Sequence, residues 1–563
     1  MPKTKSISTQ TERENRILQD AESKGVLGRW ITYAKLSGPG WLQSAITLGG
    51  GSLSTSLFLG VLGGVSLLWI QPVAMVLGII MMCAISYVVL STGKRPFELI
   101  RTRVNPVIAW GWIIATFLAN IIWSLPQFSL GTAAVTRNLV PGSNPYVVSF
   151  VMLAISVAII WFYDSGRKGI RIFENLLKLF VALIVLSFVG VVVKLGYSDN
   201  GLNWGAILGG FVPDFKQLTT PAATFSESLS GLSDEAYEFW RGTIVSLQRS
   251  VIFSGVTYAV GINMTFLLPY SQLAKGWNRN FRGLAVFDLS TSLLIPFILA
   301  TSCVVIAASN QFHTDPEEGL MTKLTAAGEV VLMNEGPQNT ALAGAYRTLL
   351  VQRLSHQGIG VSDMTEEERE IVFAQMPDKE KRLAAMLVKR GALSLATSLE
   401  PLMGYAFANY VFGFGVFAMT LSSIIILMLI NGFAFCEMLG LPHRGLWHRF
   451  GCMLPGVGVL GPLIWQGASF WVVVPTAIIG LIALPLAYLS FFVLFNSKKL
   501  LGEERVEGPK RYALNAIMIC AIVFVSFGCV WATYDRAGNL GLVGIGVFLL
   551  LAAIAHLRNR TVL

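Results

Sequence analysis

The residues of this chain that could bind a ligand are uncharged, and they collect around a glycine triplet. Gly49, Gly50 and Gly51 precede Ser52 in the middle of the first long apolar segment. Each glycine costs a helix about 1 kcal/mol relative to alanine, so three in a row predict a break. Broken backbone at membrane depth lines a cavity or is buried in protein, and many secondary transporters bind substrate there. The triplet therefore predicts a binding site without charged side chains.

Neutral amides, hydroxyls and aromatic rings recur in the other apolar segments. Asn120, Trp123 and Gln127 share one helix face by the i, i+3, i+7 rule. Amides and hydroxyls orient a polyhydroxylated solute, and aromatic rings offer it a flat contact surface. The expected substrate-binding residues are Gln43, Thr47, Gly49, Gly50, Gly51, Ser52, Asn120, Trp123, Gln127, Asn263, Met264, Thr265, Phe266 and Asn409. We expect no catalytic residue, no metal ligand and no cofactor.

The elements that must position these residues are membrane-spanning helices. Hydrophobic residues make up 54% of the 563 positions and charged residues 13%, unlike a soluble globular protein. Runs near the ~20 residues that cross a bilayer recur along the chain. Twelve spans are expected near 38–60, 66–91, 105–127, 146–163, 172–194, 246–271, 283–308, 402–432, 452–467, 471–495, 512–534 and 540–557. The lipid bilayer is therefore an expected partner, and nucleic acid is not.

Basic residues predict the orientation of these spans. Seven Lys/Arg clusters fall in alternate loops, which places both termini in the cytoplasm by the positive-inside rule. We expect a monomeric, multi-pass protein of the inner (plasma) membrane. The expected divisions are the cytoplasmic segment 1–37, spans one to five at 38–194, an extracellular loop at 195–245, spans six and seven at 246–308, an extracellular helical insertion at 309–400, spans eight to ten at 401–495, and spans eleven and twelve with the C-terminus at 496–563.

A second interruption is predicted in span six, where Gly255, Gly261, Asn263 and Thr265 interrupt the apolar run. Broken spans one and six lie five spans apart. A pair of inverted five-helix repeats would produce this placement.

Several motifs resemble the natural resistance-associated macrophage protein (Nramp) family of divalent-metal transporters. They are Gly38-Pro39-Gly40-Trp41-Leu42, Gly166-Arg167-Lys168 followed by Glu174, Met264, Asp288, Glu400-Pro401-Leu402-Met403-Gly404, Leu484-Pro485 and Asn496-Ser497-Lys498-Lys499. The resemblance covers spans one to ten. It implies an all-α polytopic membrane protein with a leucine-transporter-type fold: inverted five-helix repeats plus two additional C-terminal helices, alternating access and, commonly, proton coupling.

The chain departs from this family where the family binds metal. The family motif Asp-Pro-Gly-Asn is replaced by Gly49–Ser52, and Met-Pro-His is replaced by Met264-Thr265-Phe266. Residues 104–138, around span three, contain no Asp or Glu. Divalent cations prefer carboxylate and carbonyl oxygens or, for softer metals, sulfur. The absence of carboxylates predicts a substrate other than a metal.

The expected function is therefore secondary active import of an uncharged polar solute, most simply a hexose, in symport with protons. A divalent-metal transporter (manganese, iron or magnesium) of the Nramp type, an amino-acid symporter and a sensor on a transporter scaffold are the alternatives. Sodium is the alternative coupling ion. The candidate ion-coupling residues are Glu227, Asp234, Glu235 and Asp288. No phosphate-binding loop or catalytic triad is present, so we expect no enzyme.

Overall fold

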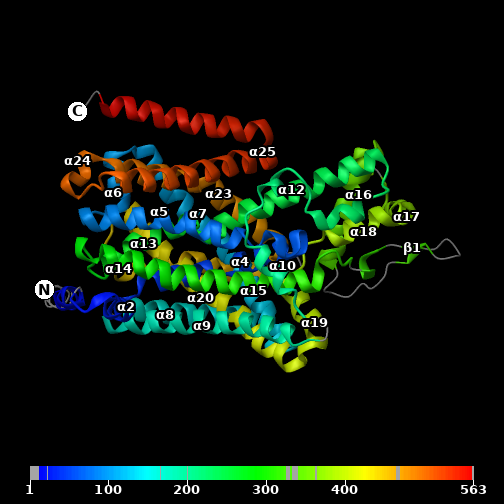
Figure 1. Cartoon of the computed structure of the whole chain (residues 1–563), viewed down its shortest axis with the longest axis horizontal. Helices are drawn as coiled ribbons and strands as arrows, with labels where there is room; N and C mark the ends of the chain where they lie inside the picture. The colour runs from blue at the N-terminus through cyan, green and yellow to red at the C-terminus, as the bar shows by residue number, and fades with distance from the viewer. Residues whose placement is uncertain are drawn as a thin grey trace.

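The chain forms a bundle of long helices that run along its longest axis (Figure 1). The computed structural model describes residues 12–560 except 22, 165–166, 199–200, 317, 322, 325–329, 332–339, 362–363 and 465–468. Gly166, a residue of the family motif, lies outside this described part. Both termini lie at one end of the bundle, and α16 (Thr340–His356), α17 (Glu366–Gln375) and α18 (Asp378–Met386) lie at the other end (Figure 1).

The first span consists of two helices, α3 (Pro39–Thr47) and α4 (Gly50–Gly63). Leu48 and Gly49 separate them with ψ angles of 62° and 176°, at the place where the glycine triplet predicts a break. The sixth span is divided in the same way into α12 (Asp234–Ala259) and α13 (Ile262–Ala274). Gly261, with a ψ of 164°, lies in that second break. Each break leaves backbone groups without helical partners, which other atoms must satisfy.

The described residues contain nine helical stretches that are long and apolar enough to cross a membrane. They are Gly50–Leu67, Ile70–Thr92, Pro106–Leu139, Pro145–Tyr163, Gly169–Gly196, Arg279–Phe312, Phe407–Met438, Pro509–Asp535 and Ala537–Arg558. The other three expected spans correspond to the broken pair α12–α13, to the short α21 (Leu446–Met453) with α22 (Gly461–Ile464), and to α23 (Ser469–Asn496). The expected all-α polytopic fold is confirmed.

The long helices of the bundle are α5 (Ile70–Thr92), α7 (Pro106–Ala134), α8 (Pro145–Asp164), α9 (Arg167–Gly196), α15 (Ile295–Phe312), α20 (Phe412–Met438) and α25 (Pro509–Arg560). The shorter elements are α2 (Gly25–Leu36), α6 (Pro96–Arg103), α10 (Trp204–Gly209), α11 (Ser226–Leu229), α14 (Arg282–Leu289), α19 (Ala392–Met403), α24 (Lys498–Leu501), and the two-residue antiparallel strands β1 (Lys323–Leu324) and β2 (Val330–Val331).

Helix α20 is the central helix of the bundle, and it packs against α7, α9, α3 and α21. In the most apolar 18-residue segment of Phe407–Met438, 89% is buried inside the protein. In the corresponding segment of Ala537–Arg558, only 6% is buried. The last helix therefore lies at the periphery. Gly538, in a left-handed conformation with a φ of 54°, marks the kink that divides α25 in two.

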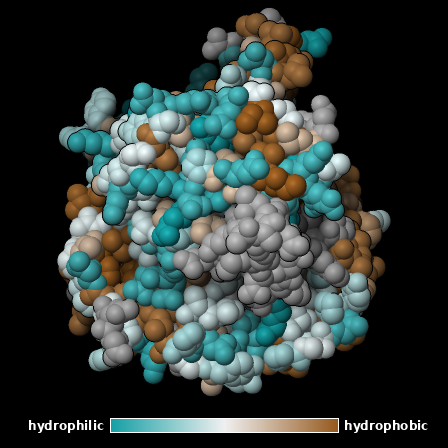
Figure 2. Space-filling model, turned by 90° about the vertical axis from the view of Figure 1, so that its right-hand side faces the viewer, coloured by the Kyte–Doolittle hydropathy of each residue, from teal (hydrophilic) through white to brown (hydrophobic). Residues whose placement is uncertain are grey.

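The polar end of the molecule is organised around a buried arginine. Arg353 of α16 is 1% exposed and donates to Glu380 of α18 at 2.6 Å and to Glu235 at 2.9 Å. Glu235 lies in the first turn of α12, so this helix extends about a dozen residues beyond the apolar run. Hydropathy alone does not detect this extension because its first turns are charged. Hydrophilic residues lie over much of this end face (Figure 2).

Candidate functional site

The two helix breaks lie against each other in the interior of the bundle. Oγ1 of Thr47, the last residue of α3, lies 3.0 Å from Sδ of Met264 and 3.5 Å from the carbonyl oxygen of Ala259. Ala259 ends α12, and Met264 lies in the first turn of α13. Thr47 and Met264 are at most 2% exposed. A hydroxyl, a thioether and a backbone carbonyl from both broken spans therefore meet at one point.

Side chains from two other spans satisfy backbone groups at the first break. Oε1 of Gln127 in α7 accepts from the backbone N–H of Gly50 at 3.0 Å. Oγ of Ser422 in α20 donates to the carbonyl of Ala45 at 3.0 Å. Oγ of Ser52 donates to the carbonyl of Thr47, which bridges the break within the span itself. These contacts fix the break, because unsatisfied backbone groups are costly in a membrane.

The glycines at the first break allow close approach of neighbouring helices. A Cβ atom on Gly50 would lie 2.8 Å from Leu130 Cδ2 and 2.9 Å from Gln127 Oε1. A Cβ atom on Gly49 would collide with Ser423 Oγ of α20. The triplet thus serves packing as well as the change in backbone direction.

Three asparagines from three helices form a hydrogen-bonded chain beside the second break. Asn263 Nδ2 donates to Asn120 Oδ1 at 3.3 Å, and Asn120 Nδ2 donates to Asn431 Oδ1 at 2.9 Å. Nδ2 of Asn431 and both amide atoms of Gln43 are buried without a hydrogen-bond partner in the described part of the chain. A buried polar group left in this way costs about 1–3 kcal/mol. These amides are therefore available to a polar ligand.

An aromatic wall lies next to the asparagines. Trp112 Nε1 donates to Thr265 Oγ1 at 3.1 Å, and its ring lies 5.1 Å from that of Phe266. Phe266 in turn stacks on Tyr270 at 4.4 Å. The expected binding residues Thr265 and Phe266 are thus held in contacts within the protein. Trp123 is also largely buried, with 8% of its surface exposed.

Asn409 does not belong to this group of residues. It lies before α20, where it bonds with Asn138 at 2.8 Å and with Glu400 at 3.3 Å. Fourteen residues separate it from Ser423, which corresponds to about 21 Å along a helix. As a polar residue in an apolar segment, Asn409 could have belonged to the binding site. Only the packing of the helices shows that it lies away from the helix breaks.

The acidic residues expected to couple ions lie in two different places. Glu227, Asp234 and Glu235 lie at the polar end, and Glu235 is separated from Ala259 by the whole of α12, about 36 Å. Asp288 lies near the start of α3, is 1% exposed and accepts from the backbone N–H of Gly40 at 2.7 Å. Of these acidic residues, only Asp288 lies against α3 of the first span.

Asp288 is part of a buried charged group that the sequence analysis did not assemble. It accepts from Ser37 Oγ and from Ser292 Oγ, the latter at 3.0 Å. Lys178 Nζ donates to the backbone carbonyl of the same Ser37 at 3.2 Å. Glu174 pairs with Lys275 at 3.0 Å, and both would contact a Cβ atom on Gly38. Charged side chains of α9 and α14, together with Lys275 at the end of α13, thus surround the start of α3.

Asn431 and the carbonyl of Ala259 are further site groups that sequence reasoning missed. Asn431 offered a signal, because it is a polar residue inside the long apolar run of α20. The carbonyl of Ala259 offered no signal in the sequence, because every residue has a backbone carbonyl. Within the described residues, no group of three or more His, Cys, Asp or Glu side chains could hold a metal ion.

Comparison with known proteins identifies the family. The model described as natural resistance-associated macrophage protein-like (Nramp) matches residues 40–331 and 383–532, more than half of the chain. The chain belongs to the Nramp family. The "Metal transporter Nramp4" of Arabidopsis thaliana is 25% identical over 199 residues, which are 35% of this chain and 38% of that protein. The "Manganese transporter pdt1" of Schizosaccharomyces pombe is 26% identical over 184 residues, 32% of this chain and 34% of that protein.

The chain resembles solved structures over nearly its whole length. A mutant of the Eremococcus coleocola manganese transporter aligns with a TM-score of 0.61 over 94% of this chain and 96% of that chain, at 13% identity. This likeness concerns the fold, which is of the leucine-transporter type. In sequence, the chain spans only about a third of the length of the curated relatives it matches.

The prediction of a hexose symporter is wrong. The matching family model is that of Nramp, and the matching relatives are named metal or manganese transporters. These findings favour the divalent-metal alternative over both organic-solute readings. The sequence argument failed because it counted charged side chains only. Partial negative charge also comes from the carbonyl ends of helices, which residue types do not reveal.

Proposed function

We propose that this protein transports a divalent metal cation, with manganese as the reference substrate, by alternating access. The observation that supports this proposal is the convergence of two helix carboxyl ends, at Thr47 of α3 and Ala259 of α12, beside Met264. A helix carries about half a negative charge at its carboxyl end. Two such ends attract a cation.

The proposed ligands are Met264 Sδ, Thr47 Oγ1 and the carbonyl oxygen of Ala259. A thioether favours transition metals, whereas magnesium and calcium prefer oxygen alone. These donors are neutral, so the bound ion keeps its two positive charges. We therefore expect weaker binding than at a carboxylate site, and we expect manganese to be preferred to magnesium.

Uptake into liposomes that contain only this protein and a metal-sensitive dye tests the proposal. Met264→Leu keeps the side-chain volume but removes the sulfur, so we expect manganese uptake to fall strongly. Met82→Leu, in the buried part of α5, is the matched control and should retain uptake. Equal uptake by both variants, or no uptake of any divalent metal by the wild type, would contradict the proposal.

Protons are the proposed coupling ion, and Asp288 is the proposed acceptor. It is the expected acidic residue that lies against α3, and it contacts Ser37 and Gly40 at the start of this helix. Movement of α3 during transport would change these contacts and thereby the proton affinity of the carboxylate. Asp288→Asn should abolish manganese-driven acidification of liposomes, while Glu227→Gln at the polar end should not. Unchanged acidification in Asp288→Asn would assign coupling to another group.

The proposed setting is the inner (plasma) membrane, with both termini in the cytoplasm. Both termini lie at the same end of the bundle, opposite α16–α18 (Figure 1). The basic loops favour the cytoplasm for that end.

A further inference from the structure

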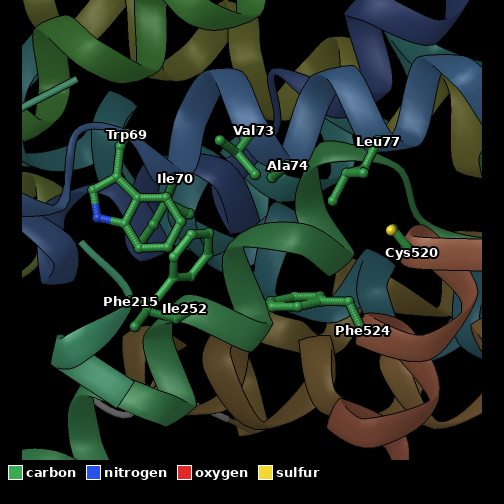
Figure 3. Close-up of a pocket in the computed structure, with 9 residues that line it drawn as sticks. All are labelled: Trp69, Ile70, Val73, Ala74, Leu77, Phe215, Ile252, Cys520 and Phe524. Carbon is green, nitrogen blue, oxygen red and sulfur yellow. The ribbon is translucent and has the colours of Figure 1, made fainter. Parts of the chain in front are cut away.

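An apolar cavity lies on the flank of the bundle, away from the helix breaks. It has a volume of about 270 Å³ and lies between α5, α12, α25 and the short turn at residues 215–218 (Figure 3). Six of its nine lining residues are Trp69, Val73, Leu77, Phe215, Ile252 and Phe524. Figure 3 shows the two aromatic rings of Trp69 and Phe215 at one end and Cys520 near Leu77 at the other.

The cavity is continuous with the surface that faces the bilayer. On α5, Val76 lies between the lining residues Val73 and Leu77 and is 44% exposed. On α25, Ile519 and Val523 flank the lining residue Cys520 and are 47% and 61% exposed. In a membrane protein such exposed apolar side chains contact lipid. The hydrocarbon chains of lipids are therefore the groups that can enter this cavity from the surrounding bilayer.

Water is a poor occupant of this cavity. An ordered water needs two to four polar partners, and apolar cavities of about 150 Å³ stay dry and bind benzene instead. Among the nine lining residues, only the Trp69 indole and the Cys520 thiol carry a polar side-chain group. A volume of about 270 Å³ is large enough for an extended hydrocarbon segment.

The ring of Trp69 closes one end of the cavity, and its nitrogen lies on the side away from the other lining residues (Figure 3). It is 2% exposed, and its indole N–H is buried without an acceptor in the described part of the chain. Its ring meets Phe215 edge-on at 5.1 Å. The next residue, Lys216, is exposed and carries a positive charge. A hydrocarbon chain and a negative charge occur together in a phospholipid.

We propose that this cavity binds one acyl chain of a membrane phospholipid. The chain lies between α5, α12 and α25. The phosphate of this phospholipid lies near Lys216. The proposal does not depend on the identity of the transported substrate. Because α12 leads directly into the break at Ala259, an occupied cavity would also support the position of this helix.

Native mass spectrometry of the protein extracted from phospholipid nanodiscs tests this assignment. Cys520→Trp fills the cavity from α25, and Val73→Phe fills it from α5. Ile519→Trp and Val76→Phe are the matched controls, because they add similar bulk to neighbouring positions that face the bilayer. We expect the wild type and both controls to retain one bound phospholipid, and both filling variants to lose it.

Retention of the phospholipid by both filling variants would overturn the proposal. Equal loss from the controls would also overturn it, because the lipid would then belong to the general bilayer contact. Lys216→Gln removes the positive charge, so we expect reduced retention; unchanged retention would refute the phosphate contact.

Discussion

The backbone N–H of Gly50 donates to Oε1 of Gln127 at 3.0 Å, so a side chain of α7 satisfies the first free N–H group of α4. The two residues lie 77 positions apart. Because helix ends leave backbone donors unpaired, this contact links the third span to the second helix of the first span. It makes Gln127 a residue that positions the break.

Gln127→Leu should therefore destabilise the protein and impair transport. A buried N–H group without an acceptor costs about 1–3 kcal/mol, and we expect a loss of that size in the free energy of unfolding. Thermal unfolding in detergent and manganese uptake are the measurements. Gln127→Glu keeps an acceptor and should be more stable than Gln127→Leu. Equal stability of the two variants would show that the hydrogen bond is unimportant.

Substitution of Gly50 should affect transport more than substitution of a glycine that has open space around it. A Cβ atom at this position would lie 2.8 Å from Leu130 and 2.9 Å from Gln127, so one of the helices must move. We expect Gly50→Ala to reduce uptake and Gly50→Leu to abolish it. Gly544→Ala, where no neighbouring atom lies within 4 Å, is the control. Normal uptake by Gly50→Leu would remove the break from the transport pathway.

Thr47 should contribute its hydroxyl to the bound ion. Thr47→Val preserves the shape of the side chain and removes the oxygen, and a lost contact of about 1.4 kcal/mol corresponds to a tenfold weaker affinity. Thr47→Ser retains the oxygen and should bind nearly as well as the wild type. Concentration dependence of manganese uptake measures both. If Val and Ser variants behave alike, Thr47 serves packing and not binding.

Arg353 should be the most sensitive residue at the polar end. Its removal would leave Glu380, 4% exposed and also bonded to Trp240 at 2.8 Å, as a buried charge without its partner. Breaking a buried pair in this way costs about 3–5 kcal/mol, so Arg353→Met should lower the unfolding temperature markedly. Arg241→Met removes an exposed pair worth about 0–1 kcal/mol. Similar losses in both variants would contradict this view of the polar end.

Glu235 should make this end of the protein sensitive to acid. The hydrogen bond from Arg353 lowers the pKa of the Glu235 carboxyl. A lowered native pKa stabilises the protein above the unfolded pKa of about 4.3, and this stabilisation is lost as the pH falls through the native value. The unfolding temperature of the wild type should exceed that of Glu235→Gln at neutral pH, and the difference should disappear in acid. A difference that is independent of pH would exclude the ion pair as its cause.

Much of the architecture could be predicted from the sequence because its causes are local. Spans follow from the hydropathy of neighbouring residues, and the break at Leu48–Gly49 follows from the helix cost of consecutive glycines. The order of the motifs from Gly38 to Lys499 was enough to suggest the family. The extension of α12 to Asp234 was not predicted, since its charged first turns interrupt the apolar pattern.

The contacts at the breaks were decided by tertiary structure alone. Thr47 and Met264 are 217 residues apart, and no local pattern states that their side chains lie 3.0 Å from each other. Asn409 and Asn120 looked equivalent as polar residues in apolar spans, yet only Asn120 bonds to the second broken span. Residue types and spacing thus determined which helices form and where they break. Packing determined which faces meet, and it brought two helix carboxyl ends to one point, because the contacts that align them join segments far apart in the chain.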